Sequence, residues 1–157
     1  MNLCSLNIRG FRDPHKLEWL IRLRREHQLN FCGLQETRLQ EIYSDVGDWW
    51  GCSNVGIEGV KATGRSGGIL YFLDKSVFQV IATIKSRNYL ALVGYWQDIV
   101  GETILVNVYA PQPPAEKKQL WDDLSSLMAS RPGKWVLFGD FNAVRSPDCN
   151  SPKFSHF

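Results

Sequence analysis

The sequence predicts a single α/β domain, and three observations support this fold class. Short apolar segments typical of strands alternate along the chain with segments of helical periodicity. The 157 residues suffice for one domain, and 44% of them are apolar, including six Trp, five Tyr and eight Phe for a core. The charged fraction of 22% is average, which excludes a disordered tail, a collagen-like fibre and a disulfide-stapled mini-protein.

The first third of the chain predicts two strands that flank a helix. Leu3 to Ile8 is a short apolar run, and Leu29 to Leu34 is a second one. Between them, residues 15–27 carry leucine and isoleucine on one side, as an amphipathic helix does. Asp13 and Pro14 precede this segment as an N-cap and a first helical residue.

The middle of the chain predicts mostly strands. The polar stretch from Leu39 to Val46 is compatible with a further helix. Ile69 to Phe72 follows a glycine-rich turn and has strand composition. Val77 to Ile84 and Tyr89 to Trp96 alternate well enough to pair around the turn Ser86-Arg87-Asn88.

The last third predicts a strand, a helix and a final strand. Thr103 to Tyr109 is rich in β-branched residues, and Trp135 to Phe138 resembles a buried strand. Between them, apolar residues recur at helical spacing from Pro113-Pro114 to Pro132-Gly133. Regular patterning stops after Asn142, so we assign residues 1–144 to the domain and 145–157 to an irregular tail.

The charge distribution leaves the choice of partner open. Eighteen basic against sixteen acidic residues give a net charge of +2, which neither establishes nor excludes a nucleic-acid partner. The first helix carries a basic face of Lys16, Arg22, Arg24 and Arg25. This face could attract a DNA backbone, and a solvated helix face explains it equally well.

The cysteines and the hydropathy indicate an intracellular protein. Cys4, Cys32, Cys52 and Cys149 form no CxxC pair and no zinc-ligand spacing. Buried reduced thiols are therefore the preferred interpretation, with a structural disulfide as the alternative. We find no signal peptide and no run of about 18 apolar residues, so no membrane is expected.

Polar residues suited to chemistry stand where several predicted strands end. A rigid sheet that presents side chains from its strand ends is a common way to build a site. Their oxygens suit a hard ion such as Mg²⁺, with Mn²⁺ as the alternative. Each residue alone also has a plain structural interpretation, as a helix cap, a turn residue or a solvated charge. The set comprises Asn7, Glu36, Tyr109, Asp140 and Asn142.

Five short motifs in a fixed order are more specific than any single residue. Together they resemble the endonuclease/exonuclease/phosphatase superfamily, and most closely the apurinic-type endonuclease domain of plant LINE-like (non-LTR) retrotransposons. The resemblance implies a four-layered α/β (α+β) sandwich, in which two packed β-sheets are flanked by helices. The motifs are Leu6-Asn7-Ile8-Arg9-Gly10, Leu34-Gln35-Glu36-Thr37-Arg38, Ser66-Gly67-Gly68-Ile69, Asn107-Val108-Tyr109-Ala110-Pro111 and Gly139-Asp140-Phe141-Asn142.

The resemblance also implies a role for each residue. Asn7 and Glu36 would bind the metal. Tyr109 and Asn142 would contact the scissile phosphate, and Asp140 would orient or activate the attacking water. A divalent ion and neutral amide donors can stabilise the charge that develops during phosphodiester hydrolysis without adding negative charge.

The sequence departs from the family pattern after residue 148. The family continues with a later asparagine, a later aspartate and a Ser-Asp-His motif, none of which is present. His15 and His27 lie on the basic helix, and His156 follows Ser155 without the aspartate. We therefore expect a C-terminally truncated domain with an incomplete sheet. Gln112 is a smaller departure, because many relatives have asparagine there.

The expected function is Mg²⁺-dependent hydrolysis of DNA phosphodiesters by a retrotransposon-type endonuclease, impaired by the missing motif. One alternative is a non-catalytic retroelement remnant, and another is a phosphatase of the same superfamily. DNA is the expected partner, and genomic DNA as substrate would imply the nucleus.

Overall fold

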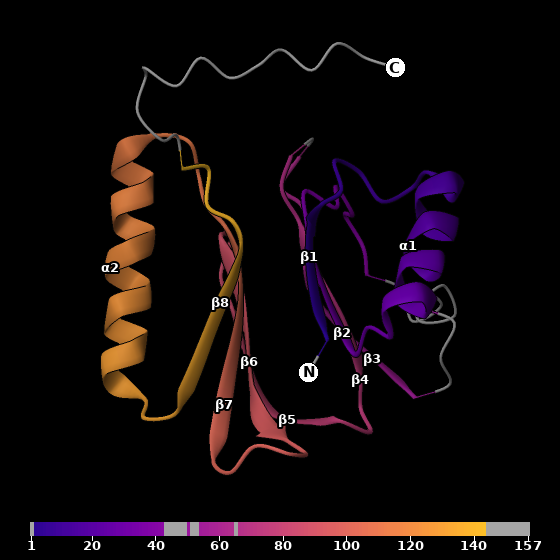
Figure 1. The fold of residues 1–157 in the computed structure, drawn as a ribbon. Coiled ribbons are helices and arrows are strands. Elements are labelled where there is room, and N and C mark those ends of the chain that lie inside the picture. The colour runs from indigo at the N-terminus through magenta and orange to yellow at the C-terminus, as the bar shows by residue number, and fades with distance from the viewer. Residues whose placement is uncertain (1, 43–49, 51–53, 65, 144–157) are drawn as a thin grey trace.

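Two four-stranded sheets lie face to face, with one helix on the outer side of each (Figure 1). The computed structural model describes residues 2–42, 50, 54–64 and 66–143. Helix α1 spans Pro14–His27 and covers the first sheet, and helix α2 spans Pro114–Ser130 and covers the second. The predicted four-layered sandwich of two packed sheets flanked by helices is confirmed.

The first sheet has the strand order β1-β2-β4-β3. β1 and β2 are parallel, and the remaining pairs are antiparallel. Helix α1 connects β1 to β2, as a parallel pair requires a crossover. The bounds are Leu3–Asn7 for β1, Phe31–Gln35 for β2, Val55–Val60 for β3 and Ile69–Asp74 for β4.

The second sheet has the order β5-β6-β7-β8 and repeats this plan in reverse. Its first three strands are antiparallel, and helix α2 connects the parallel pair β7 and β8. In the described part of the chain, β1 and β8 are therefore edge strands, one in each sheet. The bounds are Phe78–Lys85 for β5, Tyr89–Trp96 for β6, Glu102–Tyr109 for β7 and Lys134–Asp140 for β8.

The space between the sheets is filled by aromatic rings. Phe31 on β2 contacts Tyr71 and Phe138 edge-on, with ring centroids 4.7 Å and 6.1 Å away. Gly33 on the same strand lets the sheets approach, because a Cβ there would lie 2.9 Å from the Asn107 amide nitrogen. This close contact fixes the position of the strand ends of one sheet relative to the other.

The predicted helix starts are confirmed. Asp13 accepts a hydrogen bond from the backbone N–H of His15 at 3.0 Å, as an N-cap does. Lys16 on the first turn donates from Nζ to the carbonyls of Ile8, Arg9 and Gly10, at 2.8–3.2 Å. This lysine of the basic face therefore holds the loop after β1.

Two sequence expectations differ from the structure. Strand β3 was not predicted, because its glycines at positions 56 and 59 interrupt the apolar pattern. A Cβ at Gly56 would lie 2.9 Å from Leu73, so close packing against β4 requires the glycine. The stretch judged compatible with a helix is not helical at residues 39–42, of which 40 and 41 form bends, and 43–46 lie outside the described residues, as does the 145–157 tail. Neither described helix has the length and apolar character to cross a membrane.

Candidate active site

The five predicted site residues come together at one end of the two sheets. Asn7 is the last residue of β1, and Glu36 directly follows β2 in the first sheet. Tyr109 and Asp140 are the last residues of β7 and β8, and Asn142 lies two positions further along. Hydrogen bonds connect Asn7, Glu36, Tyr109 and Asp140 directly, and Asn142 joins through Asp140.

Asn7 bridges the two carboxylates. Its Nδ2 donates to Oε1 of Glu36 at 3.0 Å and to Oδ2 of Asp140 at 2.7 Å. The amide thereby holds two negative groups from different sheets close together, although they repel each other. Its Oδ1 accepts from the backbone N–H of Arg9 at 3.3 Å, which orients the amide.

Three side chains contact the Glu36 carboxylate, two from the strands β1 and β7 and one from the loop after β2. Besides the bond from Asn7, Oε1 accepts a hydrogen bond from the Tyr109 hydroxyl at 3.0 Å. Nη2 of Arg38 lies 3.6 Å from Oε2. The backbone of Glu36 has a φ of 53°, a left-handed conformation that is rare outside glycine and marks a position held by its surroundings.

The Tyr109 phenol remains protonated at neutral pH. The pKa of Tyr109 is raised to about 12, first by burial and then by the hydrogen bond to Glu36 and the negative charges of Glu36 and Asp140. Arg38 opposes this shift. The hydroxyl is therefore a neutral hydrogen-bond donor at the edge of the carboxylate pair.

The turn after β8 is fixed from both sides. Oδ1 of Asp140 accepts from the backbone N–H of Asn142 at 3.0 Å, and Asn142 has a φ of 45°. Nδ2 of Asn142 donates to the Ala110 carbonyl at 2.6 Å. On the other side, Nζ of Lys117 on α2 donates to the Asn142 carbonyl at 2.7 Å.

A buried amide pair supports the site from beneath. Nε2 of Gln35 donates to Oδ1 of Asn107 at 2.5 Å, and Asn107 donates to the carbonyls of Leu34 and Leu70. Both side chains are almost fully buried. Gln35 directly precedes Glu36, and Asn107 lies two positions before Tyr109, so the pair joins the two strand ends.

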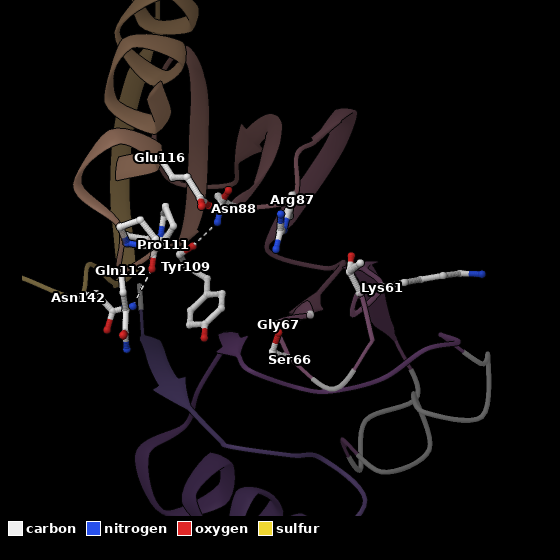
Figure 2. Close-up of a pocket in the computed structure, with 14 residues that line it drawn as sticks. Lys61, Ser66, Gly67, Arg87, Asn88, Tyr109, Pro111, Gln112, Glu116 and Asn142 are labelled. Carbon is white, nitrogen blue, oxygen red and sulfur yellow. Dashed lines mark hydrogen bonds between the residues drawn. The ribbon is translucent and has the colours of Figure 1, made fainter. Parts of the chain in front are cut away.

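A surface pocket of about 290 Å³ adjoins this cluster (Figure 2). Tyr109 and Asn142 belong to both, and Figure 2 shows the Tyr109 ring between Asn142 and Gly67. Arg87 and Asn88, from the turn between β5 and β6, line another side of the pocket. Its further lining residues are Lys61, Thr63, Ser66, Gly68, Ala110, Pro111, Gln112, Pro113 and Glu116.

The donor set fits a hard divalent cation that keeps much of its hydration. The Glu36 and Asp140 carboxylates converge on the Asn7 amide nitrogen, and Mg²⁺ is commonly bound by one or two carboxylates plus waters and a phosphate. Among the described residues, no group of three or more His, Cys, Asp or Glu side chains could form a complete cage.

Several residues of the site were not assigned a role from sequence. Arg38 stands next to Glu36 in a quoted motif, but only the structure shows its contact with the carboxylate. Lys117 gives no sequence signal, because a lysine in a first helical turn is ordinary. Of the described histidines, His15 and His27 lie on α1 and do not join the cluster, and His156 lies outside the described residues.

Comparison with known proteins agrees with this architecture. The model of the endonuclease/exonuclease/phosphatase family matches residues 4–151. The chain belongs to this family.

Solved structures share its fold at low sequence identity. The catalytic domain of APE2 from Xenopus laevis has a TM-score of 0.67 at 15% identity, over 94% of this chain and 60% of that one. TDP2 from C. elegans has a TM-score of 0.62 at 18% identity, over 92% and 50%. ANGEL2, a 2′,3′-cyclic phosphatase in complex with adenosine-2′,3′-vanadate, has a TM-score of 0.63 at 16% identity, over 90% and 53%. The chain thus spans about 50–60% of the length of these three chains.

Proposed function

We propose that this chain carries part of the catalytic site of a divalent-metal-dependent phosphodiester hydrolase, a DNA endonuclease of retrotransposon type. The observation that supports this most is the bridge by which Asn7 joins the carboxylates of Glu36 and Asp140. A tyrosine donor and a second amide stand beside that bridge, next to an open pocket. The order of the five motifs supports the retrotransposon type. If genomic DNA is the substrate, the protein would act in the nucleus.

Each side chain has a distinct task in this reaction. Glu36 and Asn7 would hold Mg²⁺, or Mn²⁺, which supplies positive charge for the phosphate and leaving oxygens when bound. Tyr109 turns its hydroxyl from Glu36 to a phosphate oxygen and, because its pKa is raised, donates as a neutral phenol. One N–H of the Asn142 side-chain amide bonds to the Ala110 carbonyl, and the other would donate a hydrogen bond to the phosphate.

Asp140 prepares the attacking water. Its Oδ2 accepts from Asn7 and its Oδ1 from the Asn142 backbone, so the carboxylate cannot rotate freely. Each carboxylate oxygen of Asp140 has a further lone pair that can accept a hydrogen bond from the attacking water. This hydrogen bond directs the oxygen of the water toward the phosphorus. The attack then proceeds from a fixed direction.

We expect slow hydrolysis by this chain alone. The sequence contains no Ser-Asp-His motif, and neither described histidine lies in the cluster. One missing transition-state donor reduces the rate by about 10²–10³-fold in well-studied hydrolases. Addition of a segment that carries such a motif should raise the rate by a comparable factor.

A nicking assay on supercoiled plasmid with Mg²⁺ tests the proposal. The chain is compared with Glu36→Ala and with Glu26→Ala, a matched control whose exposed carboxylate pairs with Arg22 on α1. Nicking that Glu36→Ala loses and Glu26→Ala keeps supports the endonuclease. Release of phosphate from small esters without nicking points to a phosphatase. If all three folded proteins show only the same background nicking and phosphate release, the proposed hydrolase activity is wrong and the chain is a non-catalytic remnant.

A further inference from the structure

Two cysteines stand side by side on β1 and β2, on the side of the sheet that faces α1. Cys4 and Cys32 are register partners in the parallel ladder, so their side chains project to the same face of the sheet. Both belong to the apolar cluster that packs beneath α1. Neither forms a disulfide in this structure.

The spacing of this pair suits a disulfide. Neighbouring strands lie about 4.7–4.9 Å apart, and the Cα atoms of disulfide-bonded cysteines are usually about 4.4–6.8 Å apart. Direct register partners on adjacent strands therefore fall inside this range of Cα distances. The two residues are 28 positions apart in sequence, so only the strand pairing brings them together.

The two thiols differ in access and in acidity. Cys32 is fully buried, whereas Cys4 lines a surface pocket of about 460 Å³ together with Leu23 and His27 of α1. A hydrogen bond from the Cys32 thiol lowers the pKa of Cys4 to about 7, against the effect of its partial burial. The same contact and full burial raise the pKa of Cys32. The accessible sulfur is thus the better nucleophile of the two.

We propose that Cys4 and Cys32 form an oxidation site, in which Cys4 reacts with a peroxide and Cys32 closes a disulfide between β1 and β2. This site is separate from the proposed hydrolase function and does not depend on it. Cys4 lies three residues before Asn7, and Cys32 lies four before Glu36. Oxidation would therefore add a covalent link between the two strands that carry these residues.

The chemistry proceeds in two steps. The Cys4 thiolate attacks one oxygen of hydrogen peroxide, the O–O bond breaks, and Cys4 becomes a sulfenic acid as hydroxide leaves and takes up a proton. The Cys32 sulfur then attacks the Cys4 sulfur, the S–O bond breaks, and the departing hydroxide takes the Cys32 proton as water. Two thiols lose two electrons in total, and one peroxide is reduced to two waters.

Peptide mapping of the wild-type chain tests the pair directly. Trypsin cleavage after Arg9, Arg25, Arg38, Lys61 and Arg145 places the four cysteines in four different peptides. The folded chain is treated with hydrogen peroxide, its free thiols are alkylated, and the digest is measured without reduction. We expect a cross-linked species of residues 1–9 and 26–38, two hydrogens lighter than the separate peptides.

Two comparisons make the result decisive. In a urea-unfolded sample the preference for the Cys4–Cys32 link should disappear, because the register no longer holds the thiols together. Without peroxide, iodoacetamide should label Cys4 of the folded chain at least about tenfold faster than Cys32. If Cys32 is labelled first, or if peroxide links either cysteine mainly to Cys52 or Cys149, the proposal is wrong.

Variants separate the two roles. Cys32→Ser should leave Cys4 at the sulfenic acid, which dimedone traps as an adduct on peptide 1–9. Cys4→Ser should leave Cys32 unoxidised, because the remaining thiol is buried. A dimedone adduct on Cys32 in the folded Cys4→Ser chain would contradict the assignment of Cys4 as the reactive thiol. Wild-type mapping decides the proposal if a variant fails to fold.

Discussion

Asn7 and Asp140 are 133 positions apart, and a 2.7 Å hydrogen bond joins them. The bond connects the first strand of one sheet to the last described strand of the other. Since Asn7 also donates to Glu36, one neutral side chain satisfies two carboxylates from two sheets. The candidate site therefore forms only where the two sheets pack together, because neither sheet alone supplies both carboxylates.

Replacement of Asn7 tests this bridge. We expect Asn7→Ala to lower the free energy of unfolding by about 1–3 kcal/mol, because two hydrogen bonds to carboxylates are lost and the carboxylates repel each other. Mg²⁺ should also stabilise this variant less than the wild type. Urea unfolding with and without Mg²⁺ measures both effects. Asn54→Ala changes an exposed asparagine and serves as control; equal losses for the two variants would contradict the bridge.

The buried amide pair should contribute more to stability than to chemistry. Asn107→Ala leaves Nε2 of Gln35 and two backbone carbonyls with fewer partners in a buried place, and we expect a cost of about 2–4 kcal/mol. Thermal or urea unfolding checks the value. A loss below about 0.5 kcal/mol, the range usual for surface substitutions, would show that the pair is not a structural link between the sheets.

Lys117 is expected to act as a positioning residue. Lys117→Met removes the hydrogen bond to the Asn142 carbonyl while it keeps much of the side-chain volume. We expect about a tenfold lower turnover with an unchanged KM for DNA and little change in stability, because a small displacement of a reacting group is costly. Lys118→Met is the matched control, since that exposed lysine pairs with Asp122 on the same helix. A higher KM at unchanged turnover would indicate that Lys117 binds DNA instead.

Tyr109 should make stability depend on alkaline pH. The pKa of its hydroxyl is raised from the ordinary 10 to about 12, so folding favours the protonated phenol. This contribution is complete below pH 10 and is lost as the pH rises toward 12. Tyr71 and Tyr89 have raised pKa values too, so Tyr109→Phe should lessen the alkaline loss without abolishing it.

The measurement compares unfolding free energies of the wild type and Tyr109→Phe at pH 9 and pH 11.5. The wild type should lose more stability between these pH values than the variant. An identical loss in both proteins would mean that the Tyr109 phenol titrates at its ordinary pKa.

The sequence predicted most of the fold because its signals were local. Apolar runs with flanking turn residues marked seven of the eight strands, and Asp13 with Pro14 marked the start of α1. Strand β3 escaped because its glycines are required by neighbours distant in sequence, such as Leu73 on β4. A glycine that is required by a contact with a distant residue does not contribute to the alternation of apolar and polar residues that predicts a strand.

The sequence predicted which five residues would lie at the strand ends, but not how their side chains contact one another. Motif order and strand ends identified Asn7, Glu36, Tyr109, Asp140 and Asn142, and the structure brings all five together. Their roles toward metal, water and phosphate remain predictions. Asn7 bridges two carboxylates, and Lys117 donates a hydrogen bond to the turn after β8. These contacts join residues far apart in sequence, so the spacing of residues along the chain does not predict them.

The placement of Asp140 on the last described strand has a consequence for the timing of synthesis. A ribosome that has translated β1 through β7 has already made Asn7, Glu36 and Tyr109. Asp140, the second carboxylate that Asn7 contacts, has not yet been synthesised at that point. Asp140 then has to leave the exit tunnel before β8 can dock. The hydrogen-bonded cluster of Asn7, Glu36, Tyr109 and Asp140 can therefore close only after β8 has been synthesised, however early the first sheet folds.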